Sequence, residues 1–336
     1  MIFRIAGVFS FLFLSVLPLT SVAVSERETA MISISGEAQG TTYHIKYYDP
    51  KNRNFKPAID SILTEFDKCL SLYRPDSELS AFNSGNAHTI RQRWFYQVLK
   101  RSEEIYNATG GAFDPTIMPL AEAYGFGANK TFDPENLNLD SLLALVSFKN
   151  IRFDSISVRK TKPGVKLDFN GIAQGYSVDI IGKFLRDNAI ARYMVEIGGE
   201  VLCAGQKIGG NHWVTGIENP MKPNALVATV KLSDRAMTTA GNYHNHFTKN
   251  GQTFNHIIDP RTGSMEQTDL LSVTVFARDA MTADGYDTAF FVMGLEPTKT
   301  FLKNRKDIDV YMLYTNEEGQ LLSFMTDGIK DFIQEK

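Results

Sequence analysis

Hydrophobic residues recur at helical spacing in some parts of the chain and at strand spacing in others. Residues 59–70 carry one helical stripe, which consists of Ile59, Ile62, Leu63, Phe66, Cys69 and Leu70. Strand-like runs cover 225–232 and 270–277, whereas 52–57 and 129–139 have the composition of loops. The alternation of these segments predicts an α+β fold with mixed or antiparallel sheets.

A turn rich in Asn and Gly joins a strand-like run to a second helix within residues 168–176. We expect Asn170 to cap this helix, whose buried stripe would be Ile172, Tyr176, Ile180 and Phe184. The first turn of such a helix attracts phosphate, although an ordinary capped helix has the same pattern. The segment lacks the three spaced glycines of a dinucleotide site and the Gly-Lys-Ser/Thr of a P-loop.

Residues 281–289 predict a third helix, which continues into an apolar stretch and ends at Gly294. Asp284, Asp287 and Thr288 can point from one face of it. Two carboxylates and a hydroxyl suit Mg²⁺ better than Zn²⁺, because Mg²⁺ prefers oxygen ligands. Acidic residues also favour the first turns of helices through the macrodipole, so both interpretations remain open here.

The segment from His256 to Gly263 places an imidazole beside an acid, a guanidinium and a turn. Two apolar residues after His256 suggest the end of a buried strand, and Pro260 with Gly263 predicts a turn. Histidine exchanges protons near neutral pH, which makes His256 a candidate general base. A structural histidine at a strand end has the same signature.

The first 23 residues have the pattern of an export signal. Arg4 supplies the positive charge, residues 5–19 the apolar run, and Ser21, Val22 and Ala23 a cleavage site. We therefore expect a signal peptide at 1–23, a single domain over 24–336 and a periplasmic location. No cysteine precedes Cys69, which excludes a lipoprotein anchor, but an uncleaved signal with weak inner-membrane association stays open.

Composition is that of a globular enzyme, with 336 residues of which 43% are hydrophobic and 22% charged. The formal net charge of −3 gives no basic surface for nucleic acid. Only 2 cysteines occur, Cys69 and Cys203, so there is no disulfide framework. A single disulfide between them remains open in an oxidising compartment.

Taken together and in order, these segments resemble the FAD:protein FMN transferase family, also called ApbE-type flavin transferases. The matching motifs span nearly the whole mature chain and are 39–43, 72–80, 109–116, 168–176, 195–200, 216–220, 238–241, 256–263 and 281–289. The resemblance implies two packed subdomains with mixed or antiparallel sheets, flanking helices and an FAD cleft between them.

The resemblance also implies a reaction. FAD is the substrate: its FMN half moves to a Ser or Thr hydroxyl of an acceptor protein, and AMP is released. By family analogy Mg²⁺ is held by Asp284, Asp287, Thr288 and the backbone carbonyl of Gly171, and His256 is the catalytic base. The implied acceptor is a flavoprotein subunit of a membrane redox complex, such as a sodium-pumping NADH:quinone reductase.

Flavin contacts carry over at motif positions, which are Gln39, Tyr73, Ala112, Phe113, Asp114, Asp168, Gln174, Gly198, Gly199, Thr239 and Ile258. Gln174 departs from the charged residue that several relatives carry, and Ala240 replaces the usual serine. For Tyr73 and Phe113 the alternative is a core aromatic residue. For Gly198 and Gly199 it is a simple turn between strands.

Three functions from different classes are compatible with the sequence. The first is the flavin transferase. The second is a Mg²⁺-dependent FAD pyrophosphatase, in which water replaces the acceptor hydroxyl and FMN and AMP are released. The third is a non-catalytic periplasmic flavin-binding protein, which would require the cleft but neither His256 nor the metal.

Overall fold

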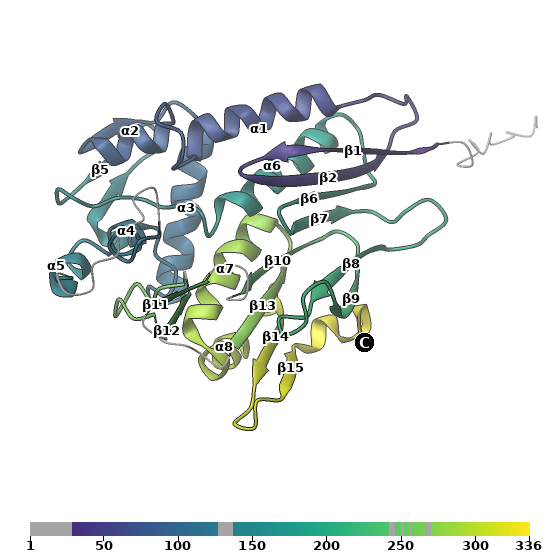
Figure 1. Cartoon of the computed structure of the whole chain (residues 1–336). Coiled ribbons are helices and arrows are strands. Elements are labelled where there is room, and N and C mark those ends of the chain that lie inside the picture. Colours follow the sequence, from purple (N-terminus) through teal and green to yellow (C-terminus); the bar gives the residue numbers. More distant parts are fainter. Residues whose placement is uncertain (1–28, 127–136, 242–245, 250–251, 256, 266–269) are drawn as a thin grey trace, which may run out of the picture.

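An eight-stranded antiparallel sheet runs through the part of the chain that the structure describes (Figure 1). This computed structural model describes residues 29–126, 137–241, 246–249, 252–255, 257–265 and 270–336. The predicted signal peptide lies outside these ranges. In spatial order the strands are β1 (Met31–Ala38), β2 (Thr41–Tyr48), β6 (Tyr193–Ile197), β7 (Glu200–Ala204), β10 (Arg235–Gly241), β13 (Leu270–Ala277), β14 (Asp309–Thr315) and β15 (Leu321–Met325).

Three smaller antiparallel sheets complete the described strands. They are β16 (Ile333–Glu335), β9 (Leu226–Leu232) and β8 (Trp213–Glu218); β3 (Ala87–Thr89), β5 (Ser157–Lys160) and β4 (Ile151–Phe153); and β11 (His246–Lys249) with β12 (Gln252–Asn255). Every strand pair in the described residues is antiparallel, so of the two predicted sheet types the structure has the antiparallel one.

Helices cover one face of the central sheet. The helices of the described residues are α1 (Lys56–Leu70), α2 (Glu78–Ser84), α3 (Arg93–Ala108), α4 (Met118–Ala123), α5 (Leu139–Leu143), α6 (Ala173–Asp187), α7 (Ala280–Met293) and α8 (Leu295–Leu302), and the short 3-10 turns are η2 (Pro115–Ile117), η4 (Phe148–Asn150) and η5 (Asp327–Phe332). Of these, η5 lies on the other face, against β9, β14 and β16. α6 packs on β6 and β7, and α7 on β10 and β13 (Figure 1). The α+β prediction is confirmed.

Alternation along the strands sorts the core into two layers. On β14, Val310 and Met312 face the helices, while Tyr311 and Leu313 face the other way. That second face is covered by β8 and β9, whose Trp213 and neighbouring apolar residues complete a separate core. The central sheet is therefore buried on both faces, with helices on one side and the small β8–β9–β16 sheet on the other.

The predicted α1 and α7 are confirmed. The apolar stripe of α1 is buried except for Ile62, which is partly buried. The helix begins two residues inside the predicted loop 52–57, because Pro57 in a first turn lacks an N–H that would have no helical partner. α7 ends at Gly294, whose φ of 80° suits glycine at a helix end. Strands β9 and β13 cover the predicted runs to within one residue.

The predicted start of α6 is wrong. Ile172, not Asn170, occupies the N-cap position, and Asn170 is exposed. The predicted stripe is also incomplete, since Ile180 and Phe184 are only partly buried. α6 lies between two apolar clusters: Tyr176 belongs to the larger, whereas Val178, Ile181 and Leu185 belong to the one under β2 and β6. A helix between two clusters buries two faces instead of one stripe.

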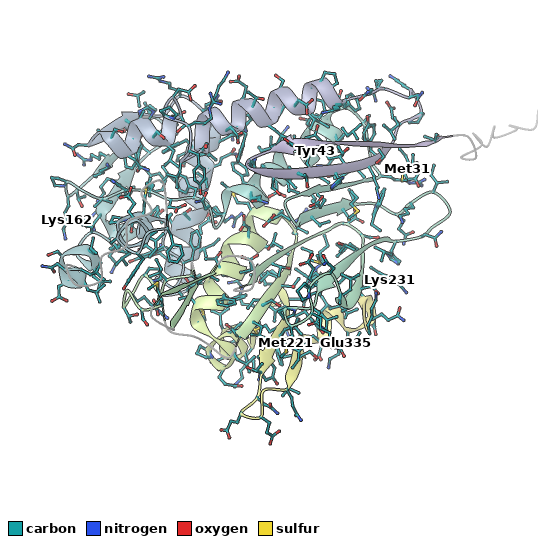
Figure 2. All side chains as sticks on the ribbon, viewed as in Figure 1. Met31, Tyr43, Lys162, Met221, Lys231 and Glu335 are labelled. Carbon is teal, nitrogen blue, oxygen red and sulfur yellow. The ribbon has the colours of Figure 1, made fainter. Side chains whose placement is uncertain are left out.

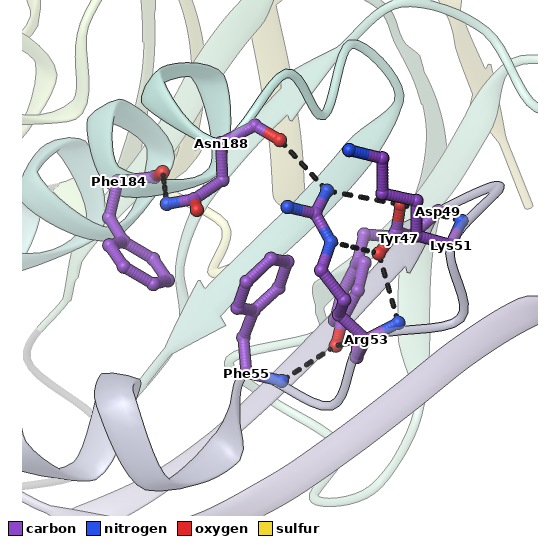
Figure 3. Close-up of polar contacts among 7 residues, drawn as sticks. All are labelled: Tyr47, Asp49, Lys51, Arg53, Phe55, Phe184 and Asn188. Carbon is purple, nitrogen blue, oxygen red and sulfur yellow. Dashed lines mark hydrogen bonds and ion pairs between the residues drawn. The ribbon is translucent and has the colours of Figure 1, made fainter.

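The β2–α1 connection is tied to the end of α6 by Arg53 (Figure 3). Arg53 Nε donates to Asp49 Oδ2 at 2.7 Å, and its Nη2 donates to the carbonyl of Asn188 at 2.9 Å. The backbone N–H of Phe55 donates to the hydroxyl of Tyr47 at 3.1 Å. The Arg53 guanidinium lowers the pKa of the buried Asp49 carboxyl to about 2. Arg53 thus joins the loop after β2 to the residue that follows α6.

α1 is also joined to the β1–β2 hairpin. Tyr43 on β2 is buried and donates its hydroxyl hydrogen bond to Asp60 of α1, and Lys56 Nζ donates to the same hydroxyl at 2.9 Å. Figure 2 shows Tyr43 close to α1 and Met221 towards the opposite end of the molecule. The hairpin is therefore held to the helical layer by a polar contact as well as by packing.

Both cysteines lie in the described part of the chain and are free. Cys69 on α1 belongs to the core on the helical face, whereas Cys203 on β7 faces the small sheet. Burial raises the pKa of both thiols. The disulfide left open by the sequence is not formed, because the central sheet separates the two side chains. Among the described residues, no helix is long and apolar enough to span a membrane.

Candidate active site

The predicted metal ligands meet where α7 passes the start of α6. Asp284 and Asp287 are 5% and 2% exposed. Asp284 Oδ2 accepts the backbone N–H of Gly175 at 2.8 Å, and Thr288 Oγ1 donates to Asp287 Oδ1 at 3.4 Å. A Cβ added at Gly171 would lie 3.0 Å from Thr288 Oγ1. Two segments more than a hundred residues apart in sequence therefore bring the four predicted ligands to one junction.

The glycine turn between β6 and β7 lies against the same junction. Gly198 and Gly199 have φ of 59° and 105°, a conformation that favours glycine. A Cβ at Gly198 would lie 1.7 Å from Nε2 of Gln174, which donates to the carbonyl of Ile197 at 3.1 Å and to Glu200 Oε2 at 2.8 Å. The turn thus has a packing role beyond joining two strands, and Gln174 is the residue that holds it to α6.

The loop after α3 approaches the junction from another side. Ala112 and Phe113 are buried, and the Phe113 ring lies 3.6 Å from where a Cβ at Gly171 would be. Phe113 belongs to the main apolar core, which agrees with the alternative prediction that it is a core aromatic residue. Asp114 Oδ1 accepts from the N–H and hydroxyl of Thr116, and Oδ2 accepts from Phe148 N–H at 3.0 Å. Burial raises the pKa of Asp114 to about 6. In this structure the Asp114 side chain organises the loop.

Asp168, Thr239 and Gln39 are partly buried. Asp168 Oδ1 accepts the N–H of Asn170 at 2.8 Å, and burial raises the pKa of Asp168 to about 6. Thr239 Oγ1 on β10 lies 2.9 Å from Thr274 Oγ1. Gln39, in the β1–β2 turn, accepts from the hydroxyl of Ser177 on α6 at 3.2 Å. Gln39 is thereby linked to Ser177 within α6, and Asp168 to Asn170 in the turn that precedes this helix.

Tyr73 and Ile258 have opposite surroundings. Tyr73, in the loop between α1 and α2, is 73% exposed, so its interpretation as a core aromatic residue is wrong. Ile258 is 5% exposed and packs with Leu120, Tyr124 and Val146. A ligand could reach the Tyr73 ring directly, whereas the Ile258 side chain is packed among apolar residues.

His256 lies outside the described residues, and the turn that follows it is described. The strand before it, β12, ends at Asn255, so the two apolar residues after the histidine are not part of a strand as predicted. The predicted turn is confirmed: Gly263 N–H donates to the carbonyl of Asp259 at 2.8 Å. Arg261 Nη2 pairs with Asp259 Oδ2 at 2.7 Å, and Arg261 Cγ lies 3.8 Å from where a Cβ at Gly111 would be. The histidine segment therefore borders the loop after α3.

Comparison with known proteins shows which family the chain belongs to. A match to the ApbE family covers residues 39–312. The chain belongs to the ApbE family. It is 34% identical over 315 residues to the FAD:protein FMN transferase of Haemophilus influenzae, across 89% of this chain and 91% of that protein.

Solved structures of ApbE proteins match the fold. The flavin transferase ApbE of Vibrio cholerae superposes with a TM-score of 0.79 at 30% identity, covering 90% of this chain and 99% of that one. The apo form of the Pseudomonas stutzeri flavinyl transferase ApbE gives 0.81 at 27% identity, covering 90% and 97%. The resemblance read from the motifs is confirmed.

The residue of this ApbE family member that the sequence did not single out is Glu200. It begins β7 directly after the glycine turn, and burial together with the charges of Asp284 and Asp287 raises its pKa well above the ordinary value. Burial raises the pKa of Asp284 to about 7, and burial with the charge of Asp284 raises that of Asp287. In the sequence, the only sign of a role for Glu200 was its place at the end of the 195–200 motif. Mutual repulsion among buried acids favours a cation.

The donor set of the ApbE junction fits a hard divalent ion. Two carboxylates, a hydroxyl and a backbone carbonyl are oxygen donors of the kind Mg²⁺ takes, and Mg²⁺ usually completes its shell with water and phosphate oxygens. Across the described residues, no group of three or more His, Cys, Asp or Glu side chains could hold a metal ion by itself. An ion here would therefore depend on the Thr288 hydroxyl, the Gly171 carbonyl and its substrate as well as on acids.

Proposed function

We propose that this protein is an FAD:protein FMN transferase that depends on Mg²⁺ and transfers FMN to a Ser or Thr hydroxyl of an acceptor protein. The observation that carries the proposal is the junction where the buried Asp284 and Asp287 meet the partly buried Thr288 and Gly171, in a chain whose family match includes all four. Relatives are named for this activity. FAD would lie between the glycine turn, the loop after α3 and the start of α6.

The transfer exchanges one phosphorus–oxygen bond for another. The acceptor hydroxyl oxygen bonds to the phosphorus of the FMN half, the bond from that phosphorus to the AMP oxygen breaks, and AMP leaves with the bonding electrons. Bound Mg²⁺ would neutralise the charge on the pyrophosphate oxygens. Asp284, Asp287, Thr288 and the Gly171 carbonyl would hold the ion.

His256 would accept the proton of the acceptor hydroxyl. A general base contributes typically about 10²–10⁴-fold to the rate. The Asp259–Arg261 pair, three and five residues further on, fixes the turn that leads away from it. The chain's own task is thus to place a proton acceptor and a cation on opposite sides of one phosphorus.

The acceptor and the location form part of the same proposal. The pattern of Arg4, the apolar run 5–19 and Ala23 supports export to the periplasm with cleavage after Ala23. The acceptor proposed is a flavoprotein subunit of a membrane redox complex. N-terminal sequencing of the exported protein tests the cleavage, since an uncleaved chain would keep its apolar segment and stay with the inner membrane.

One experiment separates the three functional classes. The full chain is incubated with FAD, Mg²⁺ and a candidate acceptor subunit. A transferase yields a fluorescent covalent adduct and one AMP per adduct, and a chelator stops both. AMP with free FMN and no adduct would identify a pyrophosphatase instead. Bound FAD with neither product would identify a flavin carrier.

A further inference from the structure

Asp179 of α6 binds the beginning of α7. Its Oδ1 accepts the backbone N–H of Ala280 at 2.8 Å, and its Oδ2 accepts that of Met281 at 2.8 Å. The N-cap residue of α7, Asp279, accepts from Thr282 N–H at 2.8 Å. Two aspartates from different parts of the chain therefore take up the first three N–H groups of this helix, which have no partner within the helix itself.

A second hydrogen-bond contact joins the two helices with donor and acceptor exchanged: here the donor is on α6 and the acceptor on α7. Gly175, one turn before Asp179 on α6, donates its N–H to Asp284, one turn after Ala280 on α7. A Cβ at Gly175 would lie 2.3 Å from the Ala280 carbonyl oxygen and 2.7 Å from Asp284 Cβ. The helices therefore pass almost in backbone contact. Each supplies one carboxylate acceptor and at least one N–H donor.

The N-terminus of α7 does not require Asp179, because Asp279 already caps it. Placing a second acid there is costly: burial, and then the charge of Asp279, raise the pKa of Asp179 to about 7. A carboxylate that accepts two consecutive N–H groups from another helix restricts how that helix rotates about its axis and slides along it. These are the two movements that would turn Asp284, Asp287 and Thr288 away from Gly171.

We propose that Asp179 is a positioning residue for the metal site: it locks α7 against α6 so that the oxygen ligands of α7 face the Gly171 carbonyl. It acts through the backbone of α7, at Ala280 and Met281, and touches no reacting atom. This inference rests on the proposed function, because it assumes the cation site. Outer-shell partners of metal ligands typically change metal affinity by about 10–100-fold when removed.

The test measures metal binding directly in the full chain. Mn²⁺ binding is followed by electron paramagnetic resonance and Mg²⁺ binding by calorimetry, for wild type, Asp179→Ala and Asp179→Asn. We expect about 10-fold or greater loss of affinity in Asp179→Ala. Asp179→Asn keeps one acceptor oxygen and the volume, so it should show a smaller loss. If Asp179→Ala does not fold, the metal affinity of Asp179→Asn tests the inference by itself.

Two controls separate positioning from general stability. Asp187→Asn removes an acid on the same helix that, among the described residues, forms an exposed ion pair with Lys183, and this variant should bind metal as wild type does. Arg53→Ala destabilises the β2–α1 connection without touching α7, and its melting temperature provides a match for the Asp179 variants. Metal affinity should fall in the Asp179 variants and not in Arg53→Ala at equal loss of melting temperature.

Metal affinity within twofold of wild type in both Asp179 variants would overturn the inference and leave the proposed function intact. So would an equal loss in Arg53→Ala. A wild-type protein that binds neither ion, with or without FAD, would overturn the metal site and this inference together.

Discussion

The backbone N–H of Gly175 donates to Asp284 Oδ2 at 2.8 Å, and this contact joins the first turn of α6 to an acid on α7. The distance is short because residue 175 has no side chain. The carboxylate is therefore oriented by a backbone donor, which cannot rotate away as a side chain can. The same glycine belongs to the 168–176 motif, and its packing role explains that position.

Gly175→Ala should separate the two helices. A Cβ would lie 2.3 Å from a backbone oxygen, so α6 and α7 must move apart, at a cost of about 1–3 kcal/mol in unfolding free energy. Urea unfolding measures the stability, and flavin transfer to an acceptor should fall by roughly 10-fold or more, since small misplacements of catalytic groups are expensive. Gly85→Ala is the matched control, because its Cβ would meet atoms no closer than 3.5 Å. Equal stability of the two variants contradicts the close crossing.

Asp287→Asn should change stability and function in opposite directions. In metal-free protein at neutral pH the substitution removes a buried acid whose ionisation is disfavoured by burial and by the charge of Asp284, so the unfolding free energy should rise. Mg²⁺-dependent transfer should fall at least about 100-fold, as expected for loss of a metal ligand in phosphoryl transfer. Thermal melts with and without Mg²⁺ show the first effect, and AMP release shows the second. A lower melting temperature without metal, together with normal transfer, would rule out the metal assignment.

Arg53→Ala should lower stability at neutral pH and much less in acid. Asp49 has a folded-state pKa of about 2, below its unfolded value, so its ion pair stabilises the fold above the unfolded pKa. That contribution is lost as pH falls through the range from about 4 to about 2. The variant should unfold at a lower urea concentration at pH 7, because a buried carboxylate loses its partner. Urea unfolding across this pH range tests the sign. The exposed Lys183–Asp187 pair is the control, and Asp187→Asn should differ little from wild type at any pH.

His256→Ala should slow the chemical step and preserve FAD binding. Loss of a general base costs typically about 10²–10⁴-fold in rate. Single-turnover transfer from FAD measures the rate, and flavin fluorescence quenching measures binding. The rate defect should shrink at high pH, where the acceptor hydroxyl needs less help with its proton. Transfer at the wild-type rate would remove His256 from the mechanism.

Local patterns predicted the elements whose signals lie close together in sequence. The apolar stripe of α1, the extent of β13 and the end of α7 at Gly294 each depend on neighbouring residues, and the structure confirms them. The acids Asp284 and Asp287 were found in the same way, since the spacing along one helix already places them on adjacent turns. The motifs identified the family for a related reason: they preserve the residue types of a site in their order along the chain.

The tertiary structure alone decided which segments meet. Asn170 looked like a helix cap, yet α6 begins three residues later and buries two faces, because it lies between two cores. Period-two alternation showed that the strands have two faces but not that β8 and β9 cover one of them. The roles of Glu200 and Asp179 depend on contacts across 84 and 101 residues of chain or more, such as the bond from Ala280 N–H to Asp179. Sequence spacing determines neighbours on one element, whereas contacts between elements follow from packing, which no local pattern encodes.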